Sequence, residues 1–324
     1  MNVFILGGTG FLGYHAALEL LKRGHSVSTL SLPPLPAEGI FPPELSIKLG
    51  NFNALSDDEV RDLMEGMDGV IFAAGVDDRI IPKAPAYPYF YDANVRAAQR
   101  FFSLAREIGV KRGVLLGSYF AYFDRIWPEL NLARKHPYIR SRKEQEEAVL
   151  ETAGTTMQMV VLELPYVFGA MPGRVPLWKP LVNYAASALP FILYPRGGTA
   201  MVSVQSVACA MAGALENKTS KSIYQIGDEN LTWVEFFERL MPILGVKKKV
   251  ITLTDGVLNV GLHILKFVHW LEGKQSGLDP AHLIELQARN TFFDPFIAQK
   301  ELGFSGGDLD QAIGDTVNGC LQDM

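Results

Sequence analysis

A glycine-rich stretch at the start of the chain carries the clearest chemical signal. Its glycines fit two spacings, Gly8-x-Gly10-x-x-Gly13 and Gly7-x-x-Gly10-x-x-Gly13. Glycines let the backbone approach a pyrophosphate closely, and the free N–H groups at the start of a following helix attract its negative charge. The spacing predicts a dinucleotide-binding site, although a tight turn that serves only packing is the alternative. The expected contacts in this stretch are Gly7, Thr9, Gly10, Phe11, Leu12 and Gly13.

The elements that flank these glycines decide between the two interpretations. Val3–Leu6 is a short apolar run of strand-forming residues, and a helical pattern follows from the glycines to about Arg23. Gly24 can then end the helix in a left-handed conformation. A strand, a glycine turn and a helix in this order form the context in which such a spacing indicates a dinucleotide site. We therefore predict that site rather than a packing turn.

The first half of the chain alternates between strands and helices. The expected strands are Ser26–Leu32, Ile47–Leu49, Gly69–Ala74 and Arg112–Leu116, and the expected helices follow the capping box Ser56–Glu59 and span Asp92–Ile108. The run Gly69–Ala74 is apolar throughout, as expected for a strand that is buried on both faces. Strands and helices that alternate at this spacing predict an α/β fold of the Rossmann type, with a doubly wound parallel sheet.

Beyond Gly169 the chain is interrupted by prolines and contains many aromatic residues. We predict strands at Met201–Val204 and Ser222–Ile226 with a helix between them, a second capping box at Thr232–Glu235, and a mostly helical remainder. The predicted dinucleotide domain comprises residues 1–168, with residues 201–227 returning to it. Residues 169–200 and 228–324 are predicted to form a smaller, helix-rich C-terminal lobe. This lobe should cover the carboxyl edge of the sheet, where open α/β sheets bind ligands.

Composition limits the classes of function. The 324 residues carry a formal net charge of −5, which gives no indication of a nucleic-acid surface. The two cysteines and six histidines show no ligand spacing, so we expect reduced thiols and no metal site. The apolar segment Val257–Leu271 is too short and too polar to span a bilayer. Because the first strand begins close to Met1, we expect no signal peptide, a cytoplasmic location and no membrane partner.

The end of the second strand should lie near the adenosine ribose of the cofactor. An acid at this position binds the ribose hydroxyls of NAD, and a basic residue binds the 2′-phosphate of NADP. The residues here are Leu30, Ser31, Leu32 and Pro33, which provide neither signal. NAD and NADP therefore both stay open. We lean slightly to NADP because no acid repels a 2′-phosphate. We expect weak discrimination between the two cofactors because no arginine nearby in sequence attracts that phosphate.

The chain resembles the extended short-chain dehydrogenase/reductase family, with its NAD-dependent epimerase/dehydratase members, over nearly its whole length. The spacing Gly7-x-x-Gly10-x-x-Gly13 is similar to the nucleotide motif of that family. Further similar segments are Gly50–Asn51, Val70–Ala74, Asn94–Arg96, Gly109–Arg112, Leu164–Gly169, Phe293–Pro295 and Glu301–Phe304. The resemblance implies NAD or NADP as the cofactor, with further contacts at Ser31, Asn51, Phe52, Ala73, Ala74, Gly75, Pro165 and Val167.

The same resemblance implies a set of catalytic residues. Gly117–Tyr122 resembles the segment that carries the catalytic serine of that family, which falls on Ser118. Pro137–Lys143 resembles the family motif Tyr-x-x-x-Lys, in which the tyrosine falls on Tyr138 and the position of the lysine is held by Arg142. Ser118, Tyr138 and Arg142 are therefore the implied catalytic residues. Tyr138 and Arg142 are also implied cofactor contacts.

The departure at Arg142 has a geometric consequence. On a helix, a residue four positions after Tyr138 lies about 40° around the axis from it, whereas Lys143, five positions on, lies about 140° away. Arg142 should therefore face the tyrosine, and Lys143 should not. A guanidinium stays protonated, so it can supply charge and hold a ribose hydroxyl but cannot pass on a proton as lysine can. Spacing alone would leave Tyr138 an ordinary helix aromatic and Arg142 a solvated charge.

These observations lead to one preferred function and two alternatives. We predict an NAD(P)-dependent oxidoreductase, in which hydride moves between the nicotinamide and an alcohol or ketone while Tyr138 exchanges the proton. Thr199–Met201 lacks the arginine usual in the nucleotide-sugar enzymes that the chain resembles, so we expect a small to medium, fairly apolar substrate molecule. An epimerase or dehydratase and a non-catalytic dinucleotide-binding regulator are the alternatives. A homodimer is left open.

Overall fold

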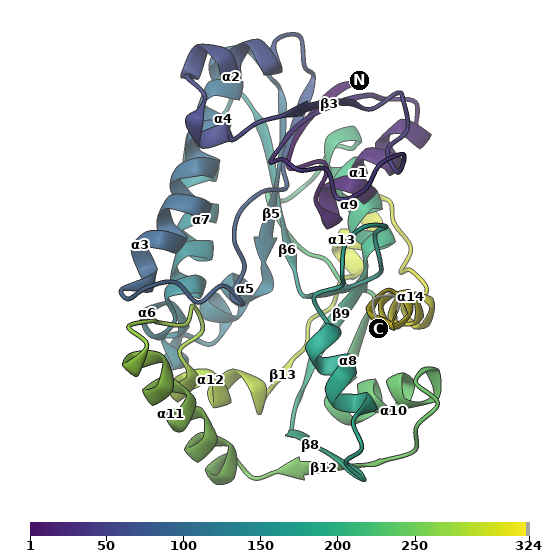
Figure 1. Cartoon of the computed structure of the whole chain (residues 1–324). Helices are drawn as coiled ribbons and strands as arrows, with labels where there is room; N and C mark the ends of the chain where they lie inside the picture. The colour runs from purple at the N-terminus through teal and green to yellow at the C-terminus, as the bar shows by residue number, and fades with distance from the viewer. Residues whose placement is uncertain (322–324) are drawn as a thin grey trace.

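The computed structural model describes residues 1–321, and its centre is a seven-stranded parallel sheet with helices on both faces (Figure 1). The strands are β1 (Asn2–Leu6), β2 (Ser26–Ser31), β3 (Ser46–Leu49), β4 (Gly69–Phe72), β5 (Arg112–Ser118), β6 (Gln158–Leu164) and β10 (Ile223–Gln225). Their order in the sheet is β10-β6-β5-β4-β1-β2-β3. The chain therefore runs outward from β1 in one direction and then outward from β4 in the other. This is the doubly wound arrangement, which confirms the predicted Rossmann-type α/β fold.

Two groups of helices cover the sheet (Figure 1). One face carries α1 (Phe11–Lys22), α9 (Val204–Glu216) and α13 (Phe296–Leu302), and the other carries α2 (Asp57–Met64), α4 (Ala97–Glu107) and α7 (Pro137–Ala153). Alternate residues of β1 face the two layers, because Val3 and Ile5 pack with the first group and Phe4 and Leu6 with the second. Since the strands are parallel, their carboxyl ends all meet at one edge between the layers.

Local signals in the sequence explain where several helices begin. Ser56 and Glu59 form the predicted capping box of α2, and Thr232 and Glu235 form the second one at α10 (Trp233–Ile243). In each box the hydroxyl and the carboxylate satisfy backbone N–H groups reciprocally. The start of α1 is different, because its N-cap is Gly10 and no side chain caps it. The first N–H groups of α1 are thus left for another partner.

The helix predicted at Asp92–Ile108 begins earlier and is irregular. The short helix α3 (Ala86–Phe90) continues through a π-helical segment, Tyr91–Arg96, into α4. Such segments arise where the regular hydrogen-bond ladder is widened, and they are frequent at functional sites. Here the segment carries the fully buried Asn94, which contacts the loop that follows β4.

The C-terminal lobe is built on two further sheets. In the larger one, β9 (Gly198–Ser203) pairs with β7 (Tyr166–Phe168), β11 (Glu229–Thr232) and β13 (Asn290–Thr291), and in the smaller one β8 (Phe191–Pro195) pairs with β12 (Lys249–Leu253). The segment 201–227 was predicted to return to the dinucleotide domain. Its β10 joins the central sheet and its α9 packs on it, and Val202 of β9 packs in the same core, but β9 pairs with β7, β11 and β13 rather than with a strand of the central sheet. The chain leaves the central sheet at Pro165, which cannot donate a ladder hydrogen bond.

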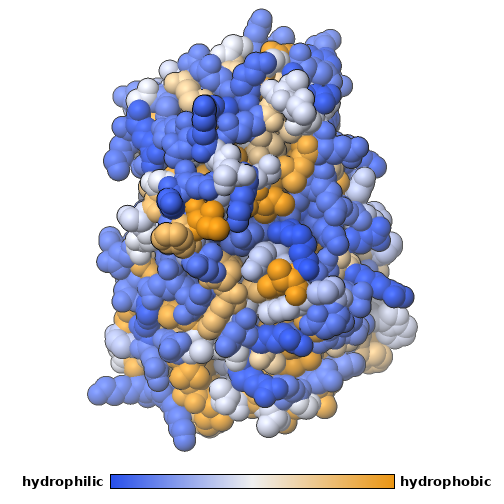
Figure 2. All heavy atoms as spheres, turned by 180° about the vertical axis from the view of Figure 1, so that it is seen from behind, coloured by the Kyte–Doolittle hydropathy of each residue, from blue (hydrophilic) through white to orange (hydrophobic). Residues whose placement is uncertain are grey.

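The remaining helices are α5 (Tyr119–Ile126), α6 (Leu132–Lys135), α8 (Lys179–Ala186), α11 (Asp255–Leu271), α12 (Pro280–Gln287) and α14 (Leu309–Leu321). None of the residues of α11 is buried, and apolar side chains such as Val260, Ile264 and Trp270 are exposed on it. Within residues 1–321, no helix combines the length and the apolarity needed to cross a membrane. Seen from behind, the surface is mainly hydrophilic, with hydrophobic residues in separate groups (Figure 2).

One buried histidine makes the stability of the fold depend on pH. His136 precedes α7, is completely buried, and accepts a hydrogen bond at Nδ1 from Asp279 N at 2.9 Å. Burial lowers the pKa of His136 to about 4, below the usual value of 6.5. The unfolded chain therefore binds a proton at a pH where the folded chain does not. The stability that the neutral ring contributes is complete above about pH 6.5 and is lost as the pH falls through 4.

We expect the free energy of unfolding to decrease by about 2 kcal/mol between pH 7 and pH 5 because of His136 alone. His136→Asn keeps an acceptor for Asp279 N but does not titrate. Between pH 7 and pH 5 its free energy of unfolding should therefore decrease by about 2 kcal/mol less than that of the wild type. Urea unfolding at the two pH values measures the difference, and His282→Asn on the nearby α12 is the control. Equal pH dependence in His136→Asn and the wild type would contradict the assignment.

Candidate active site

The glycine loop is shaped by the absence of side chains. Gly7 has a φ of +94°, and a Cβ on it would lie 2.8 Å from Ala73 O. A Cβ on Gly13 would lie only 2.3 Å from Gly7 O, so this residue lets α1 approach β1. Gly10 is more open, because its Cβ would have only Gly7 O within 4 Å, at 3.2 Å. The loop thus leaves space beside the uncapped start of α1, as a phosphate group requires.

The end of β2 holds this loop in place. Thr29 Oγ1 accepts a hydrogen bond from Gly8 N at 2.9 Å, and Ser31 Oγ accepts one from Thr9 N at 3.1 Å. Both hydroxyl residues are buried. The side chain of Ser31, which the sequence places at the ribose end of the cofactor, therefore positions the glycine loop.

A second glycine turn lies beside the first, where β4 is followed by Ala73, Ala74 and Gly75. Gly75 has a φ of +124°, and a Cβ on it would lie 2.7 Å from Asn94 Oδ1. Asn94 Oδ1 accepts a hydrogen bond from Val76 N, and Asn94 Nδ2 donates one to Val76 O. In the sequence, Asn94 is only part of the segment Asn94–Arg96 that resembles the family. The structure shows that it holds the loop at the switch point between β1 and β4.

Four other predicted cofactor residues differ in their surroundings. Asn51 is exposed beyond β3, and its Oδ1 accepts a hydrogen bond from Asn53 N at 3.0 Å. Phe52 turns into the core, with its ring 6.1 Å from that of Phe101. Pro165 is buried directly after β6, and Val167 is half-buried in β7. The side chain of Phe52 therefore packs in the core instead of pointing to the cofactor site. Its position after a strand did not indicate this.

Ser118 and Tyr138 come from different elements and meet at the carboxyl edge. Ser118 ends β5 and caps α5, accepting a hydrogen bond from Phe120 N at 3.4 Å. Tyr138 lies in the first turn of α7, and its ring packs edge-on against Phe90 and Phe120, with centroids 5.7 and 6.4 Å away. The Ser118 hydroxyl lies close enough to the Tyr138 phenol to lower the pKa of Tyr138. Both side chains are buried.

The surroundings of Tyr138 favour its protonated form. Burial raises the pKa of Tyr138, the charge of Arg142 and the nearby Ser118 hydroxyl lower it, and the charge of Asp78 raises it again. The net direction is upward, because burial disfavours a phenolate more than one cation compensates. The positive charge expected from the sequence is present, yet it does not bring the phenol down to neutral pH. A protonated phenol is a proton donor, as the reduction of a carbonyl group requires.

Arg142 faces Tyr138, as the helical spacing predicts. Its Cζ lies 5.7 Å from the centroid of the tyrosine ring, and its Nη2 donates a hydrogen bond to Leu116 O in β5. The Nε of this buried arginine has no hydrogen-bond partner within residues 1–321. Lys143 turns away, with its Nζ 2.9 Å from Asp124 Oδ2. Arg142 thus supplies the charge beside the phenol, and Lys143 belongs to a separate ion pair.

The loop after β4 adds an acid that sequence reasoning missed. Burial raises the pKa of Asp78, while the neighbouring charge of Arg79 lowers it. Burial also raises the pKa of Tyr119 and Tyr166, and the charge of Asp78 raises both further. The charge of Asp78 therefore acts on the phenols of Tyr119, Tyr138 and Tyr166. Its place in the loop that follows a buried strand was the signal that could have identified it.

A small pocket lies between the end of β5 and the C-terminal lobe. Its lining is mostly aromatic or apolar and consists of Tyr119, Phe120, Tyr166, Gly198, Trp233, Leu286, Gln287 and Thr291. Two polar atoms of this lining, Trp233 Nε1 and Gln287 Oε1, have no hydrogen-bond partner in the part of the chain that the structure describes. Since Phe120 also packs on Tyr138, the pocket is adjacent to the predicted catalytic residues.

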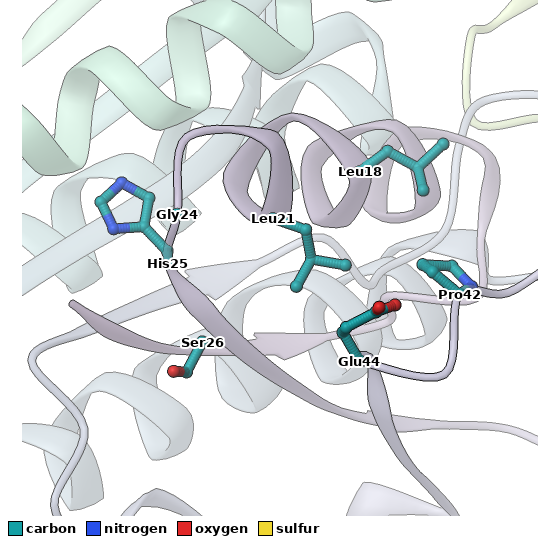
Figure 3. Close-up of a pocket in the computed structure, with 7 residues that line it drawn as sticks. All are labelled: Leu18, Leu21, Gly24, His25, Ser26, Pro42 and Glu44. Atoms are coloured by element: carbon teal, nitrogen blue, oxygen red, sulfur yellow. The ribbon is translucent and has the colours of Figure 1, made fainter.

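Another hollow lies on the outer side of α1 (Figure 3). It is lined by Leu18, Leu21, Gly24, His25, Ser26, Pro42 and Glu44. Gly24 and Ser26 lie where the chain enters β2, so this hollow is at the amino edge of the sheet, opposite to Ser118 and Tyr138. It contains none of the predicted site residues, and we assign no function to it.

Known proteins resemble this chain along its whole length. The 3beta-hydroxysteroid-dehydrogenase/decarboxylase isoform 3 of Arabidopsis thaliana is 25% identical over 351 residues, and the match covers 99% of this chain but 61% of that longer protein. The crystal structure of gox2253 has a TM-score of 0.78 at 21% identity and covers 99% of this chain and 98% of that one. UDP-glucuronic acid 4-epimerase of Bacillus cereus, solved in complex with NAD, has a TM-score of 0.71 at 14% identity, covering 99% and 97%. These structural similarities show a shared fold.

The model of the NAD dependent epimerase/dehydratase family matches residues 3–227 of the chain. The matched region contains the glycine loop and the trio Ser118, Tyr138 and Arg142. It covers more than half of the protein, and the relatives found are named as dehydrogenases, reductases and epimerases. This protein therefore belongs to the NAD-dependent epimerase/dehydratase family of enzymes.

Proposed function

We propose that this enzyme is an NAD(P)-dependent oxidoreductase that acts on an alcohol or ketone. The observation that supports this most is that Ser118 and Tyr138 lie together at the carboxyl edge of the sheet, beside the aromatic lining formed by Tyr119 and Phe120. Ser118 holds the substrate oxygen, and Tyr138 gives it a proton in reduction or takes one in oxidation. A bound nicotinamide supplies or accepts the hydride.

The residues at the edge fit a dinucleotide cofactor. The loop Gly7–Gly13 leaves space beside the uncapped N-terminus of α1, and the unpartnered Nε of the buried Arg142 is a free donor in the part of the chain that the structure describes. We propose that the glycine loop holds the pyrophosphate and that Arg142 holds a ribose hydroxyl. The complexes of structural neighbours with NAD support the same class of cofactor.

The lining of the pocket favours a fairly apolar substrate, but its cavity of about 10 Å³ has room for about one water molecule, so the small to medium size rests on the sequence alone. Most of its lining residues are aromatic or apolar, so binding there removes apolar surface from water. Trp233 Nε1 and Gln287 Oε1, which have no partner within residues 1–321, can each pair with a polar group on the substrate. Thr199–Met201, where an arginine would bind a diphosphate, forms part of the buried strand β9. This argues against a nucleotide sugar.

An epimerase that oxidises its substrate transiently is the second candidate, because several structural neighbours are named as sugar-nucleotide epimerases. A panel of ketones and alcohols with NADPH, NADH and their oxidised forms separates the two activities. Net change in nicotinamide absorbance supports the oxidoreductase. Interconversion of epimers without such a change supports the epimerase, and tight nucleotide binding without either reaction supports a non-catalytic regulator.

The charge of Arg142 should be visible in the pH profile of the reaction. In alcohol oxidation Tyr138 must be deprotonated, so activity rises with pH through the pKa of the phenol. Because Arg142 lowers that pKa, Arg142→Met should move the rising limb of kcat upward by about one pH unit or more. Arg142→Lys keeps a positive charge on the same helical face and should leave the limb near its original position. An unshifted limb in Arg142→Met would rule out an electrostatic role.

A further inference from the structure

A tight turn just beyond β7 presents an arginine to the glycine loop. Arg174 N donates a hydrogen bond to Met171 O at 3.2 Å, and between them lie Pro172 and Gly173, the latter with a φ of +73°. Proline followed by a residue with positive φ is the sequence of a type II turn. The conformation of the backbone at Arg174 is therefore well determined by the residues before it.

Packing against two other elements places this turn. A Cβ on Gly173 would lie 2.5 Å from Pro36 O and 2.7 Å from the Cβ of Ala37, so the turn is in close contact with the loop that follows β2. On the other side, His15 Nε2 lies 3.0 Å from Ala170 O, which joins the segment to α1. The turn is thus held between the second strand and the first helix, the two elements that frame the adenosine end of a Rossmann site.

The guanidinium of Arg174 is only partly satisfied. Its Nε and Nη2 donate hydrogen bonds to Thr9 O at 3.3 and 3.2 Å. Across residues 1–321, no carboxylate lies within ion-pair distance of it. A guanidinium has five N–H donors, so those not engaged by Thr9 point to solvent or to a ligand. Arg174 therefore places a positive charge without a counter-charge on the rim of the glycine loop.

The position of Thr9 shows which part of the cofactor this charge would meet. Thr9 N donates to Ser31 Oγ at the end of β2, where dinucleotide folds place the adenosine ribose. NAD-binding sites use an acid there, and Ser31 is neutral. We infer that Arg174 binds the 2′-phosphate of the cofactor and that the enzyme therefore prefers NADP(H). This inference rests on the proposed dinucleotide site, and it replaces the weak discrimination expected from the sequence.

The chemistry of the two groups supports the match. Arginine binds phosphate oxygens through paired, charge-assisted hydrogen bonds that are shorter and stronger than neutral ones. The bond to Thr9 O orients the planar guanidinium beforehand, so less side-chain freedom is lost when a phosphate binds. A ribose hydroxyl, which is neutral, would gain little from the same arrangement.

The test measures binding and does not need turnover. Dissociation constants for NADPH, NADH, 2′,5′-ADP and 5′-AMP are determined by calorimetry, since the last two ligands differ only in the 2′-phosphate. We expect the wild type to bind NADPH at least tenfold more tightly than NADH. Arg174→Ala should weaken the binding of NADPH and 2′,5′-ADP about 10- to 100-fold and leave the affinities for NADH and 5′-AMP unchanged. Arg174→Lys should retain part of the preference, and Arg134→Ala on the surface of α6 should change nothing.

Two results would overturn the inference. One is a wild type that binds NADH as tightly as NADPH. The other is an equal loss of affinity for all four ligands in Arg174→Ala, which would mean that Arg174 binds the pyrophosphate or stabilises the loop. Circular dichroism and thermal unfolding of each variant establish that it is folded. A protein that binds NADPH as described but converts no ketone or alcohol would refute the proposed oxidoreductase activity and leave the role of Arg174 intact.

Discussion

Tyr138→Phe is expected to lower kcat by a factor of about 10² to 10⁴, the usual contribution of a positioned general acid or base. The substitution removes the proton that the phenol exchanges, but it keeps the ring that packs against Phe90 and Phe120. Nucleotide affinity and thermal stability should therefore stay close to those of the wild type. Steady-state kinetics with the best substrate of the ketone panel, together with NADPH titration, measure both quantities.

Tyr122→Phe is a matched control for this experiment. Tyr122 lies on the adjacent α5 and also packs edge-on against an aromatic ring, that of Phe293. Tyr122 is not part of the predicted site, so removal of its hydroxyl should leave kcat unchanged. If Tyr138→Phe retained full activity in an otherwise active enzyme, another group would have to be the acid. The half-buried Asp78 would be the next residue to replace, because its raised pKa also favours a protonated form.

Gly10→Val is expected to weaken dinucleotide binding by more than about a hundredfold, which corresponds to roughly 2.7 kcal/mol. A pyrophosphate can approach the start of α1 only because Gly10 has no side chain, and a valine there would occupy that space. Gly10 has a φ of −83°, which other residues adopt readily, so the backbone itself should tolerate the change. Calorimetric titration with NADPH and NADH measures the loss.

The choice of Gly10 over Gly13 follows from the structure. A Cβ on Gly13 would lie 2.3 Å from Gly7 O and 2.8 Å from Gly8 Cα, so its replacement would disturb the loop even without a cofactor. At Gly10 the nearest atom would be 3.2 Å away. Gly314→Val in α14, where a Cβ meets no atom within 4 Å, serves as the control for a valine in a helix. Unchanged affinity in a folded Gly10→Val variant would mean that the cofactor lies elsewhere.

Much of the site is formed by residues that lie close together in the sequence. The glycine loop follows β1 directly and precedes α1, and Tyr138 and Arg142 are separated by about one turn of α7. The helical period is therefore enough to place the arginine beside the phenol and Lys143 away from it. Because parallel strands share one carboxyl edge, the ends of β1, β4 and β5 could also be expected to meet. These relations carried the prediction of the fold and of the face that Arg142 shares with Tyr138, whereas Ser118 and Tyr138 themselves were implied by the family resemblance.

By itself, then, the sequence determined the order of strands and helices, the glycine loop and the face that Tyr138 shares with Arg142. Only the tertiary structure decided that Phe52 turns into the core, that the charge of Asp78 acts on Tyr138 and that Arg174 contacts Thr9. It also decided the ionisation of Tyr138, since burial by surrounding elements outweighs the nearby charge. The physical reason is the same in each case. Loop conformation and burial depend on packing between segments that no helical or strand period connects, so residue types alone do not determine them.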